Sequence, residues 1–317
     1  MKSIPARKLF FSLLSISIIF TGCQKETGVL LNPATNLQPP VVNAGTSQVI
    51  QLPAATFTLT GSATSTNGSI KAYLWSMVSG PNVPSINSPG SKITTVSGFI
   101  AGNYIFQLMA TDSAGLTGVD TTSVLVNPSP IQTLTLQPTN NIDDVHFGLW
   151  GSTPISDPNS PEFSGAAWTN GGILFTLRGA FKFNLSTIPA SATILTAKLT
   201  LYSNPTPLNG DQINANSGPN NSIYISRITG AWTSATINWF TQPPVSATDQ
   251  ISIAHTTQSL LDLVDVDVKN QVAAMVSGSN YGFMIRLQNE TIYNIRDFCS
   301  SRYSNAAKHP KLVITYQ

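Results

Sequence analysis

The chain of 317 residues is poor in charge, since only 9% of its residues are Asp, Glu, Lys or Arg. Three of its 16 basic residues lie in the first 22 positions, so the remainder carries 13 basic against 14 acidic residues. No basic stripe remains of the kind that binds nucleic acid, and that class of partner is excluded. The surface must instead be covered by the abundant Thr, Ser, Asn, Gly and Pro, as in many extracellular β proteins.

Catalytic signatures are also missing. The three histidines, His146, His255 and His309, are far apart and lack the spacing of metal ligands. There is no GxSxG, HExxH or P-loop motif, and no pair of carboxylates is placed to flank a glycosidase cleft. The stretch LVDVDV comes closest, but its alternation predicts a half-buried strand with solvated or strand-capping side chains at Asp265 and Asp267. We therefore predict a protein that is not an enzyme.

Residues 1–22 have the pattern of a signal peptide, with the basic start MKSIPARK ahead of an apolar run from Leu9 to Phe20. This run is too short to span a bilayer as a mature helix. The following FTGC resembles the bacterial lipobox, in which the chain is cut before the cysteine and the thiol carries a diacylglycerol. The resemblance implies lipidation of Cys23 and a place at the outer membrane or cell surface. An ordinary secreted protein or an uncleaved anchor is the alternative.

Lipidation of Cys23 would leave Cys299 as the other cysteine, so no disulfide within the chain is predicted. Cys299 lies in the alternating stretch YNIRDFCSSRY, which predicts a buried and inert thiol. Residues 23–39 show no periodicity and predict a flexible, lipidated tether.

Residues 40–128 alternate short β-branched and aromatic runs with turn residues, and no helical period appears. This pattern predicts an antiparallel β-sandwich. We expect Trp75 to fill the centre of its core and Tyr104 to begin a strand as the tyrosine-corner residue of immunoglobulin-like sandwiches does. Asp112 should open the next turn by accepting backbone hydrogen bonds.

The phrases PPVVNAG, LTGSATSTNGSIKAYLWSMVSGP and AGNYIFQLMATDSAG resemble a PKD domain, an immunoglobulin-like module of cell-surface and polysaccharide-degrading proteins. The resemblance implies either a weak glycan or protein contact or a rigid spacer, of which we favour the spacer. Family members usually carry an Asp-rich turn before the Trp strand, whereas residues 64–68 here read TSTNG. A calcium ion at this turn is therefore doubtful, because calcium prefers carboxylates.

Residues 131–317 follow a short junction at Ser129 and Pro130 and contain about nine or ten strand-like runs, TINWF among them, with one helical candidate at Lys269–Val276. This content predicts an all-β, two-sheet jelly roll. The segment from Asp143 to Gly172 is rich in Gly, Pro and Trp and lacks alternation. We expect it to be a long loop at one end of the domain.

Four phrases in this second domain resemble, in order, the DNRLRE domain, which is grouped with carbohydrate-binding module family 96: RGAFKFNLSTIPASATILTAKLTLYS, RITGAWTSATINWFTQPP, LVDVDVKNQVAAMVSGSNYGFMIRLQ and FCSSRYSNAAKHPKLVITY. The resemblance implies a jelly roll on a surface or secreted protein with a polysaccharide partner, in some members an acidic one such as alginate. Asn184 stands where the family pattern has Asp. Asn can partly replace Asp in a strand-end hydrogen bond, but it would weaken the binding of a cation. Trp232 and Trp239 lie inside a shared phrase and are expected to be framework residues.

The candidate ligand-binding residues are Trp150, Trp168, Tyr293 and Arg296. Exposed indoles stack on the apolar face of a sugar ring, and a guanidinium binds hydroxyls or a carboxylate. The alternative is that the long loop folds back and both tryptophans fill a small core of its own, as in Ω-loops. For Arg296 the alternative is a pairing with Asp297 or with a neighbouring strand.

Asp143 and Asp144 stand at the start of this expected loop and are candidate ligands for a structural calcium ion, although most adjacent Asp pairs in loops form turns. The leading hypothesis is a non-catalytic surface lipoprotein that binds polysaccharide. A structural or adhesive protein that binds another surface protein is a second hypothesis. A polysaccharide lyase is a third, and it would have to assemble His146, Tyr293, Arg296 and Arg302.

Overall fold

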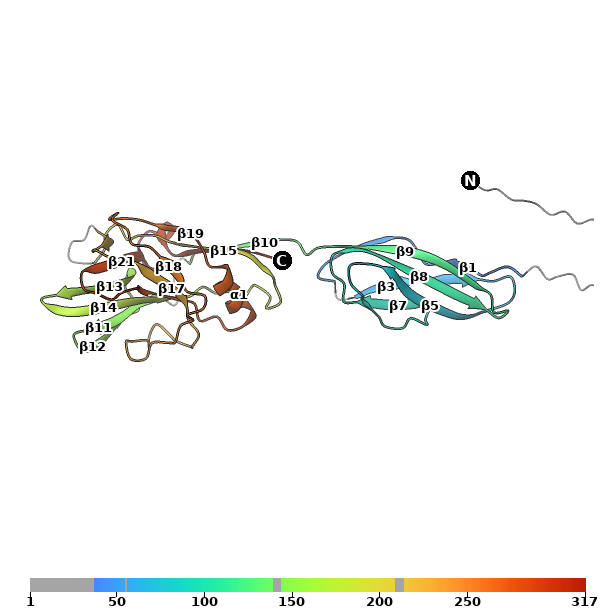
Figure 1. Cartoon of the computed structure of the whole chain (residues 1–317), viewed down its shortest axis with the longest axis horizontal. Coiled ribbons are helices and arrows are strands. Elements are labelled where there is room, and N and C mark those ends of the chain that lie inside the picture. Colours follow the sequence, from blue (N-terminus) through green and yellow to red (C-terminus); the bar gives the residue numbers. More distant parts are fainter. Residues whose placement is uncertain (1–36, 55, 139–143, 209–213) are drawn as a thin grey trace, which may run out of the picture. The chain divides into compact units, whose positions relative to one another are not determined.

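The computed structural model describes residues 37–54, 56–138, 144–208 and 214–317. The chain divides into two compact units, with boundaries after Val49, Ala54 and Leu125, and both units are built almost entirely of strands (Figure 1). The predicted fold class, an immunoglobulin-like sandwich followed by a jelly roll, is confirmed. Among the residues described, no helix combines the length and hydropathy that crossing a membrane requires.

The first unit contains a sheet of order β2-β9-β8-β5, a sheet of order β3-β7-β6 and the pair β1-β4. Its strands are β1 Val41–Asn43, β2 Gln48–Gln51, β3 Thr56–Thr60, β4 Ser62–Thr64, β5 Ile70–Ser79, β6 Ser85–Ile86, β7 Ile93–Ser97, β8 Gly102–Asp112 and β9 Thr117–Asn127.

Trp75 belongs to the core of the first unit and is 1% exposed, as the sequence predicted. Tyr104 is buried at the start of β8, and its hydroxyl accepts a hydrogen bond from the backbone N–H of Ile100 at 3.0 Å. Asp112 ends β8 and accepts the backbone N–H groups of Ala114 and Leu116, each at 3.0 Å. The predictions for all three residues are confirmed.

The second unit contains a four-stranded sheet of order β10-β22-β15-β19 and a nine-stranded sheet. The path β16-β21-β13-β14-β20-β17-β18 makes up most of the larger sheet, and β11 pairs with both β12 and β14. The strands are β10 Gln132–Leu136, β11 Asp144–Trp150, β12 Thr153–Asp157, β13 Glu162–Asn170, β14 Ile173–Phe181, β15 Ile194–Leu201, β16 Asn216–Ser217, β17 Ile223–Arg227, β18 Ile251–Ile253, β19 Leu263–Asp267, β20 Phe283–Leu287, β21 Asn294–Cys299 and β22 Lys311–Tyr316.

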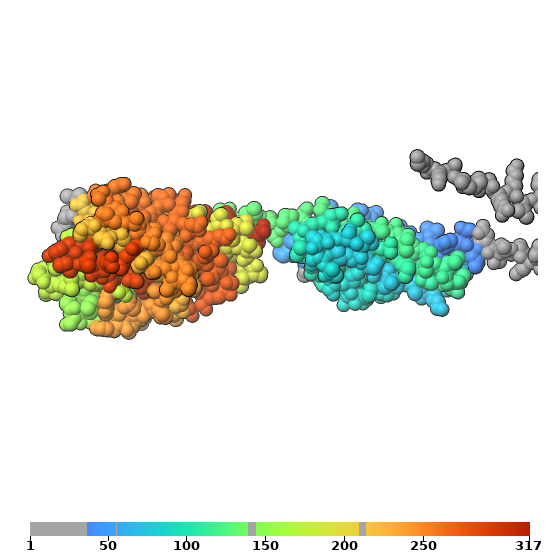
Figure 2. Space-filling view, in the orientation of Figure 1, coloured from blue at the N-terminus to red at the C-terminus, as the bar shows by residue number. Residues whose placement is uncertain are grey.

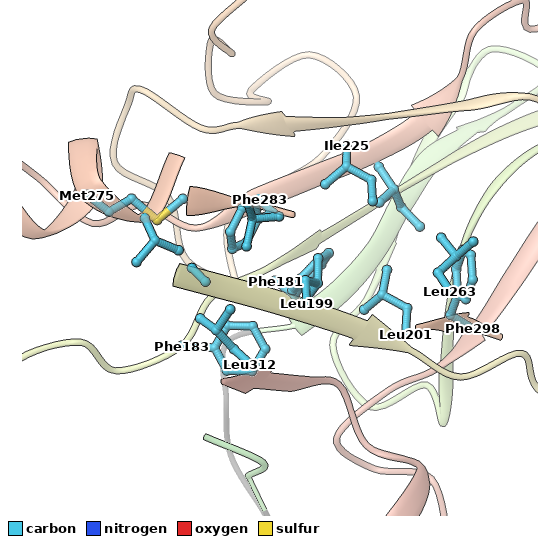
Figure 3. Packing of buried hydrophobic residues seen from close by; sticks show 14 of the residues in the cluster. Phe181, Phe183, Leu199, Leu201, Ile225, Leu263, Met275, Phe283, Phe298 and Leu312 are labelled. Carbon is cyan, nitrogen blue, oxygen red and sulfur yellow. The ribbon is translucent and has the colours of Figure 1, made fainter. Parts of the chain in front are cut away.

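A large apolar cluster fills the second unit (Figure 3). Phe181 is at its centre, with ring centroids 5.1 Å from Phe163 and 5.4 Å from Phe283. The predicted helix is present as α1 Lys269–Ser277 and adds Val272 and Met275 to the cluster. A short 3-10 turn, η1 Ala306–Lys308, precedes β22. Burial on this scale is the main source of stability in a domain without disulfides.

The expectation of a long loop from Asp143 to Gly172 was wrong for its described part, which forms β11, β12 and β13. Small residues hide the strand pattern because neighbouring backbones come very close here. A Cβ atom on Gly148 would lie 1.9 Å from the carbonyl oxygen of Thr176, and one on Gly165 would lie 3.0 Å from the backbone of Arg286. Glycine therefore interrupts the alternation that would have identified the strands.

The strand expected at TINWF is also absent. Residues 236–240 form turns instead, in which the N–H of Ile237 donates to the carbonyl of Thr233 and the side chain of Asn238 accepts the N–H of Phe240. The prediction for Cys299 is confirmed: the thiol is fully buried and unpaired, and burial raises its pKa to about 12.

Candidate functional site

Three aromatic side chains stand side by side across three neighbouring strands of the larger sheet. Phe175 of β14 is the direct cross-strand partner of Trp150 in β11 and of Trp168 in β13. Directly opposed residues of an antiparallel pair project from the same face, so the three rings share one face. The ring of Tyr293 meets Trp168 edge to face with centroids 5.4 Å apart. We call Trp150, Phe175, Trp168 and Tyr293 the aromatic row.

Two tight hairpins position the row. Gly171 and Gly172 have φ of 58° and 80°, the left-handed values that a two-residue type I′ turn requires, and they join β13 to β14. This turn pairs Asn170 with Ile173 and therefore places Trp168 opposite Phe175. The second hairpin joins β11 to β12 through Gly151, whose φ is 59°. Two-residue turns fix register and limit motion, so the row is presented on a rigid support.

Tyr293 is held by the turn before β21. Its φ of 68° is unusual for a residue with a side chain. The amide of Asn294 stabilises this turn, since Nδ2 donates to the carbonyl of Thr291 at 3.1 Å and Oδ1 accepts the N–H of Asn220 at 2.6 Å. The strained backbone keeps the phenol against Trp168.

The aromatic row is open to solvent. Trp150 is 42% exposed and Tyr293 is 48% exposed, while Phe175 and Trp168 are half-buried. Trp150 also borders a shallow hollow of about 420 Å³, whose other lining residues are Gly151, Ser152, Thr153, Ile155 and Ile173. Figure 2 shows the yellow-green segment that contains these hairpins on the surface at one end of the second unit. The arrangement offers a ligand a line of flat apolar surface beside a hollow to which Ser152 and Thr153 contribute hydroxyl groups.

Trp150, Trp168 and Tyr293 were all expected from the sequence, and the structure brings Trp168 and Tyr293 into contact and aligns Trp150 with them. The sequence interpretation missed Phe175. A usable signal was present, because Gly-Gly between two β-branched or aromatic runs indicates a two-residue hairpin and so defines the residue opposite Trp168.

Arg296 does not belong to this surface, and its expected role as a ligand contact is corrected. The side chain is fully buried, with Nη1 donating to the carbonyl oxygen of Ala254 at 3.2 Å. Burial lowers its pKa to about 10. It does not pair with Asp297 either, because neighbouring residues of β21 project to opposite faces. A guanidinium in the interior cannot reach a polysaccharide on the surface.

The lyase hypothesis gains no support from the positions of its residues. Arg302 forms an ion pair with Asp144, Arg296 donates to Ala254, and Tyr293 packs on Trp168. His146 is half-buried in β11, four residues from Trp150, and burial lowers the pKa of its imidazole. Arg302, Arg296 and Tyr293 thus have different partners, and Nδ1 of His146 has no hydrogen-bond partner among the described protein groups.

Of the two calcium candidates, Asp144 is among the described residues, and its carboxylate already accepts hydrogen bonds from other groups of the protein. Asp144 is 1% exposed, and its carboxylate accepts the backbone N–H of Ser301 at 2.6 Å and the guanidinium of Arg302. Burial raises the pKa of Asp144, and these donors oppose the shift. Asp143 and the lipidation candidate Cys23 lie outside the described residues. Across the part of the chain that the structure describes, no three His, Cys, Asp or Glu residues gather as metal ligands would.

Trp232 and Trp239 play different supporting roles. Trp232 is 8% exposed, packs in a second apolar cluster with Phe147 and Ile237, and donates from Nε1 to the carbonyl of Tyr281 at 2.7 Å. Trp239 is half-buried beneath the guanidinium of Arg178, which lies 4.5 Å from its ring centroid. Trp232 is thus a framework residue, and Trp239 helps to hold Arg178.

Comparisons with known proteins agree with the two-unit fold. Residues 44–126 match the family model of the K319L-like PKD domain, and residues 175–316 match that of carbohydrate-binding module family 96. The chain therefore carries a PKD domain followed by a carbohydrate-binding module. Trp150 and Trp168 precede the second matched segment, whose first residue is Phe175.

Among curated relatives, the human dyslexia-associated protein KIAA0319 is 35% identical over 105 residues, which cover 32% of this chain and 10% of that protein. Mouse low-density lipoprotein receptor-related protein 11 is 36% identical over 97 residues, covering 30% of this chain and 20% of that protein. This chain thus spans only a small part of the length of the relatives it matches.

Two solved structures have low overall similarity. The solution structure of the PKD domain from human KIAA0319 has 21% identity and a TM-score of 0.27, covering 34% of this chain and 95% of that one. A structure that describes promiscuous specificity of carbohydrate-binding modules from the β-sandwich superfamily has 10% identity and a TM-score of 0.22, covering 89% and 99%.

Proposed function

We propose that this chain is a non-catalytic cell-surface lipoprotein that binds extracellular polysaccharide through the aromatic row. The row itself is the observation that carries the proposal. Sugar rings have an apolar face that packs on aromatic rings, and their hydroxyls need small polar partners of the kind that line the hollow beside Trp150. Because the hairpins hold the rings in place, little conformational entropy is lost when a glycan binds.

Binding is tested by affinity electrophoresis of residues 24–317 through gels that contain single polysaccharides. Trp168→Ala should weaken binding and so reduce the retardation. We expect its apparent Kd to rise at least about tenfold, which corresponds to about 1.4 kcal/mol. Phe240→Ala is the matched control, because Phe240 is 71% exposed in the same unit but lies outside the aromatic row. Equal retardation of wild type and both variants would move the binding surface away from the row.

The two other hypotheses predict different outcomes. A structural or adhesive protein would show no retardation in any gel and would capture one discrete protein partner. A lyase would release unsaturated products from an acidic polysaccharide faster than a heat-inactivated control does. Either result would replace the proposal of a non-catalytic glycan-binding protein.

The lipid anchor belongs to the proposal and depends on the signal-like residues 1–22 and on Cys23. Residues 23–39 would then act as a tether that holds the folded units away from an outer membrane or other cell surface. Expression of the full chain in a Gram-negative host with radiolabelled palmitate should label the wild type and leave Cys23→Ser unlabelled. Label on the Cys23→Ser variant would show that this cysteine is not the lipidated residue.

A further inference from the structure

We propose that the aromatic row selects neutral polysaccharides over acidic ones, an inference that rests on the proposed function and specifies its substrate class. The observation behind it is that the row stands among uncharged groups while the cations closest to it along the strands are turned away or paired.

The segments that form the row contain a single charged residue. They are residues 149–155, 167–177 and 288–294, and the charged residue is Glu290. Both of its carboxylate oxygens are occupied by Arg178, with Oε1 at 2.7 Å from Nε and Oε2 at 2.9 Å from Nη2. The polar groups left along these segments are hydroxyls and amides, among them Thr153, Thr169 and Asn170.

Arg178 cannot serve the row as a free cation. It lies three residues after Phe175 in β14, and since side chains alternate along a strand it projects from the opposite face. Its remaining nitrogen, Nη1, donates to Oε1 of Gln242 at 2.6 Å, and the guanidinium plane lies over Trp239. The bidentate ion pair and the stacked ring use its donors and one of its faces.

Two other arginines of the second unit cannot serve the row either, and one of them, Arg302, lies at Asp144, the end of β11 opposite to Trp150. Arg296 is fully buried, and Arg302 donates to Asp144. A glycan lying on the row would therefore meet no exposed guanidinium from these strands. The whole chain after residue 22 is close to electrical neutrality, so it provides little long-range attraction for a polyanion.

The charge of the glycan then decides the outcome. A carboxylate brought against the row would lose water without gaining a charge-assisted hydrogen bond, which is unfavourable. A neutral sugar gains the contact with the rings and keeps its hydroxyls bonded to water or to nearby amides and hydroxyls. Trp150 and Trp168 are two strand spacings apart, about 10 Å, so the row exceeds one sugar ring and favours a polymer.

The experiment compares neutral gels of mixed-linkage β-glucan, xylan and galactomannan with acidic gels of alginate and polygalacturonate, each at low and high salt. The expected result is retardation in at least one neutral gel that is insensitive to salt and lost in Trp168→Ala. Binding to the acidic gels should be at least about tenfold weaker in apparent Kd.

A second variant tests whether a cation added beside the row creates binding to an acidic polysaccharide. Thr153 is exposed and is the cross-strand partner of Trp150, so Thr153→Arg places a guanidinium beside the row. This variant should acquire salt-sensitive retardation in alginate while Thr153→Gln, its uncharged control, does not. Salt-sensitive binding of the wild type to alginate, lost in Trp168→Ala, would overturn the neutral-glycan inference and leave glycan binding intact. Absence of retardation in every neutral and acidic gel would overturn the proposed function itself.

Discussion

In the first unit, Trp75, Tyr104 and Phe106 are at most 1% exposed, whereas in the second unit Trp150 and Tyr293 keep nearly half of their surface in contact with solvent. None of the described aromatic side chains of the first unit reaches that exposure. The first unit therefore uses its rings for its own core, which suits a spacer. The second has enough aliphatic and aromatic residues for a core and still leaves the four rings of the aromatic row, as well as Phe240, at the surface. Rings that contribute little to burial are better candidates for recognition.

The two units also differ in the surroundings of a buried aspartate. Asp112 of the first unit accepts four hydrogen bonds, from Ser65, Asn67, Ala114 and Leu116, and the one from the side chain of Asn67 contributes most to lowering its pKa. Ser65 and Asn67 belong to the turn at residues 64–68, so this turn supplies two hydrogen-bond donors to the buried carboxylate.

Asp297 of the second unit is buried as completely, yet neither of its carboxylate oxygens has a hydrogen-bond donor among the described protein groups. Burial, together with the nearby carboxylate of Glu162, raises its pKa well above the ordinary value. Glu162 itself accepts hydrogen bonds from Asn204 and Leu208. The first unit thus stabilises its buried charge, whereas the second disfavours the charge on Asp297.

The largest expected effects come from the buried tryptophans. Trp75→Ala should destabilise the first unit and Trp232→Ala the second by about 3–5 kcal/mol each, the range found for removing a large buried ring. Differential scanning calorimetry should show a lowered transition for the affected unit. Trp168→Ala is the control, because a half-buried ring at the surface should leave both transitions within about 0.5 kcal/mol of wild type. A large loss of stability in Trp168→Ala would mean that the row is part of the core.

A smaller effect is expected from one hydroxyl. Tyr104→Phe removes the acceptor of the Ile100 N–H and the partner of the Asn82 side chain, at a cost of about 1–3 kcal/mol. Tyr293→Phe makes the same chemical change on a half-exposed ring and should alter the free energy of unfolding by less than about 0.5 kcal/mol. Urea denaturation of both variants measures the difference. Equal losses would remove the distinction between the tyrosines of the two units.

Asp297→Asn should raise the melting temperature of the second unit slightly at pH 7. An unfolded Asp titrates near pH ~4. Because the folded pKa of Asp297 is higher, its contribution to stability is fully present below that pH and is lost as the pH rises toward the folded pKa. Asn imitates the protonated acid and removes this loss. The gain should therefore vanish near pH 4, and a lower melting temperature for the variant at pH 7 would show that the carboxylate is ionised and partnered.

Much of the fold was predictable because it depends on local patterns. Alternation identified the two β units, the position of Trp75 and the corner at Tyr104, and helical spacing identified α1. Burial of Arg296 was not predictable, since its surroundings come from residues distant in sequence, such as Ala254. The hairpin at Gly171 and Gly172 was missed because Gly148 and Gly165, where backbones approach closely, interrupt the alternation of β11 and β13. Phe175 was missed with it. The other three rings of the row were named from the sequence, although the segment that holds Trp150 and Trp168 was expected to be a loop and forms strands.

The smallest effect is expected from removing divalent cations. In the first unit, the turn at residues 64–68 directs Ser65 and Asn67 toward Asp112, so its polar groups bind a carboxylate instead of a cation. In the second unit, both carboxylate oxygens of Asp144 already accept hydrogen bonds from Ser301 and Arg302. Calcium would have to displace the guanidinium of Arg302 from this carboxylate, and Arg302 would then lose its ion-pair partner.

We therefore expect thermal unfolding with excess chelator to match unfolding with added calcium in both transitions. The informative result would be a fall in the second transition on chelation. Asp144→Asn decides its origin: if the variant loses the response to chelator, Asp144 is a calcium ligand and its pairing with Arg302 is not the resting arrangement. If the variant responds as wild type does, the ion is bound elsewhere, and the two units then differ in cation dependence as well as in the exposure of their aromatic rings.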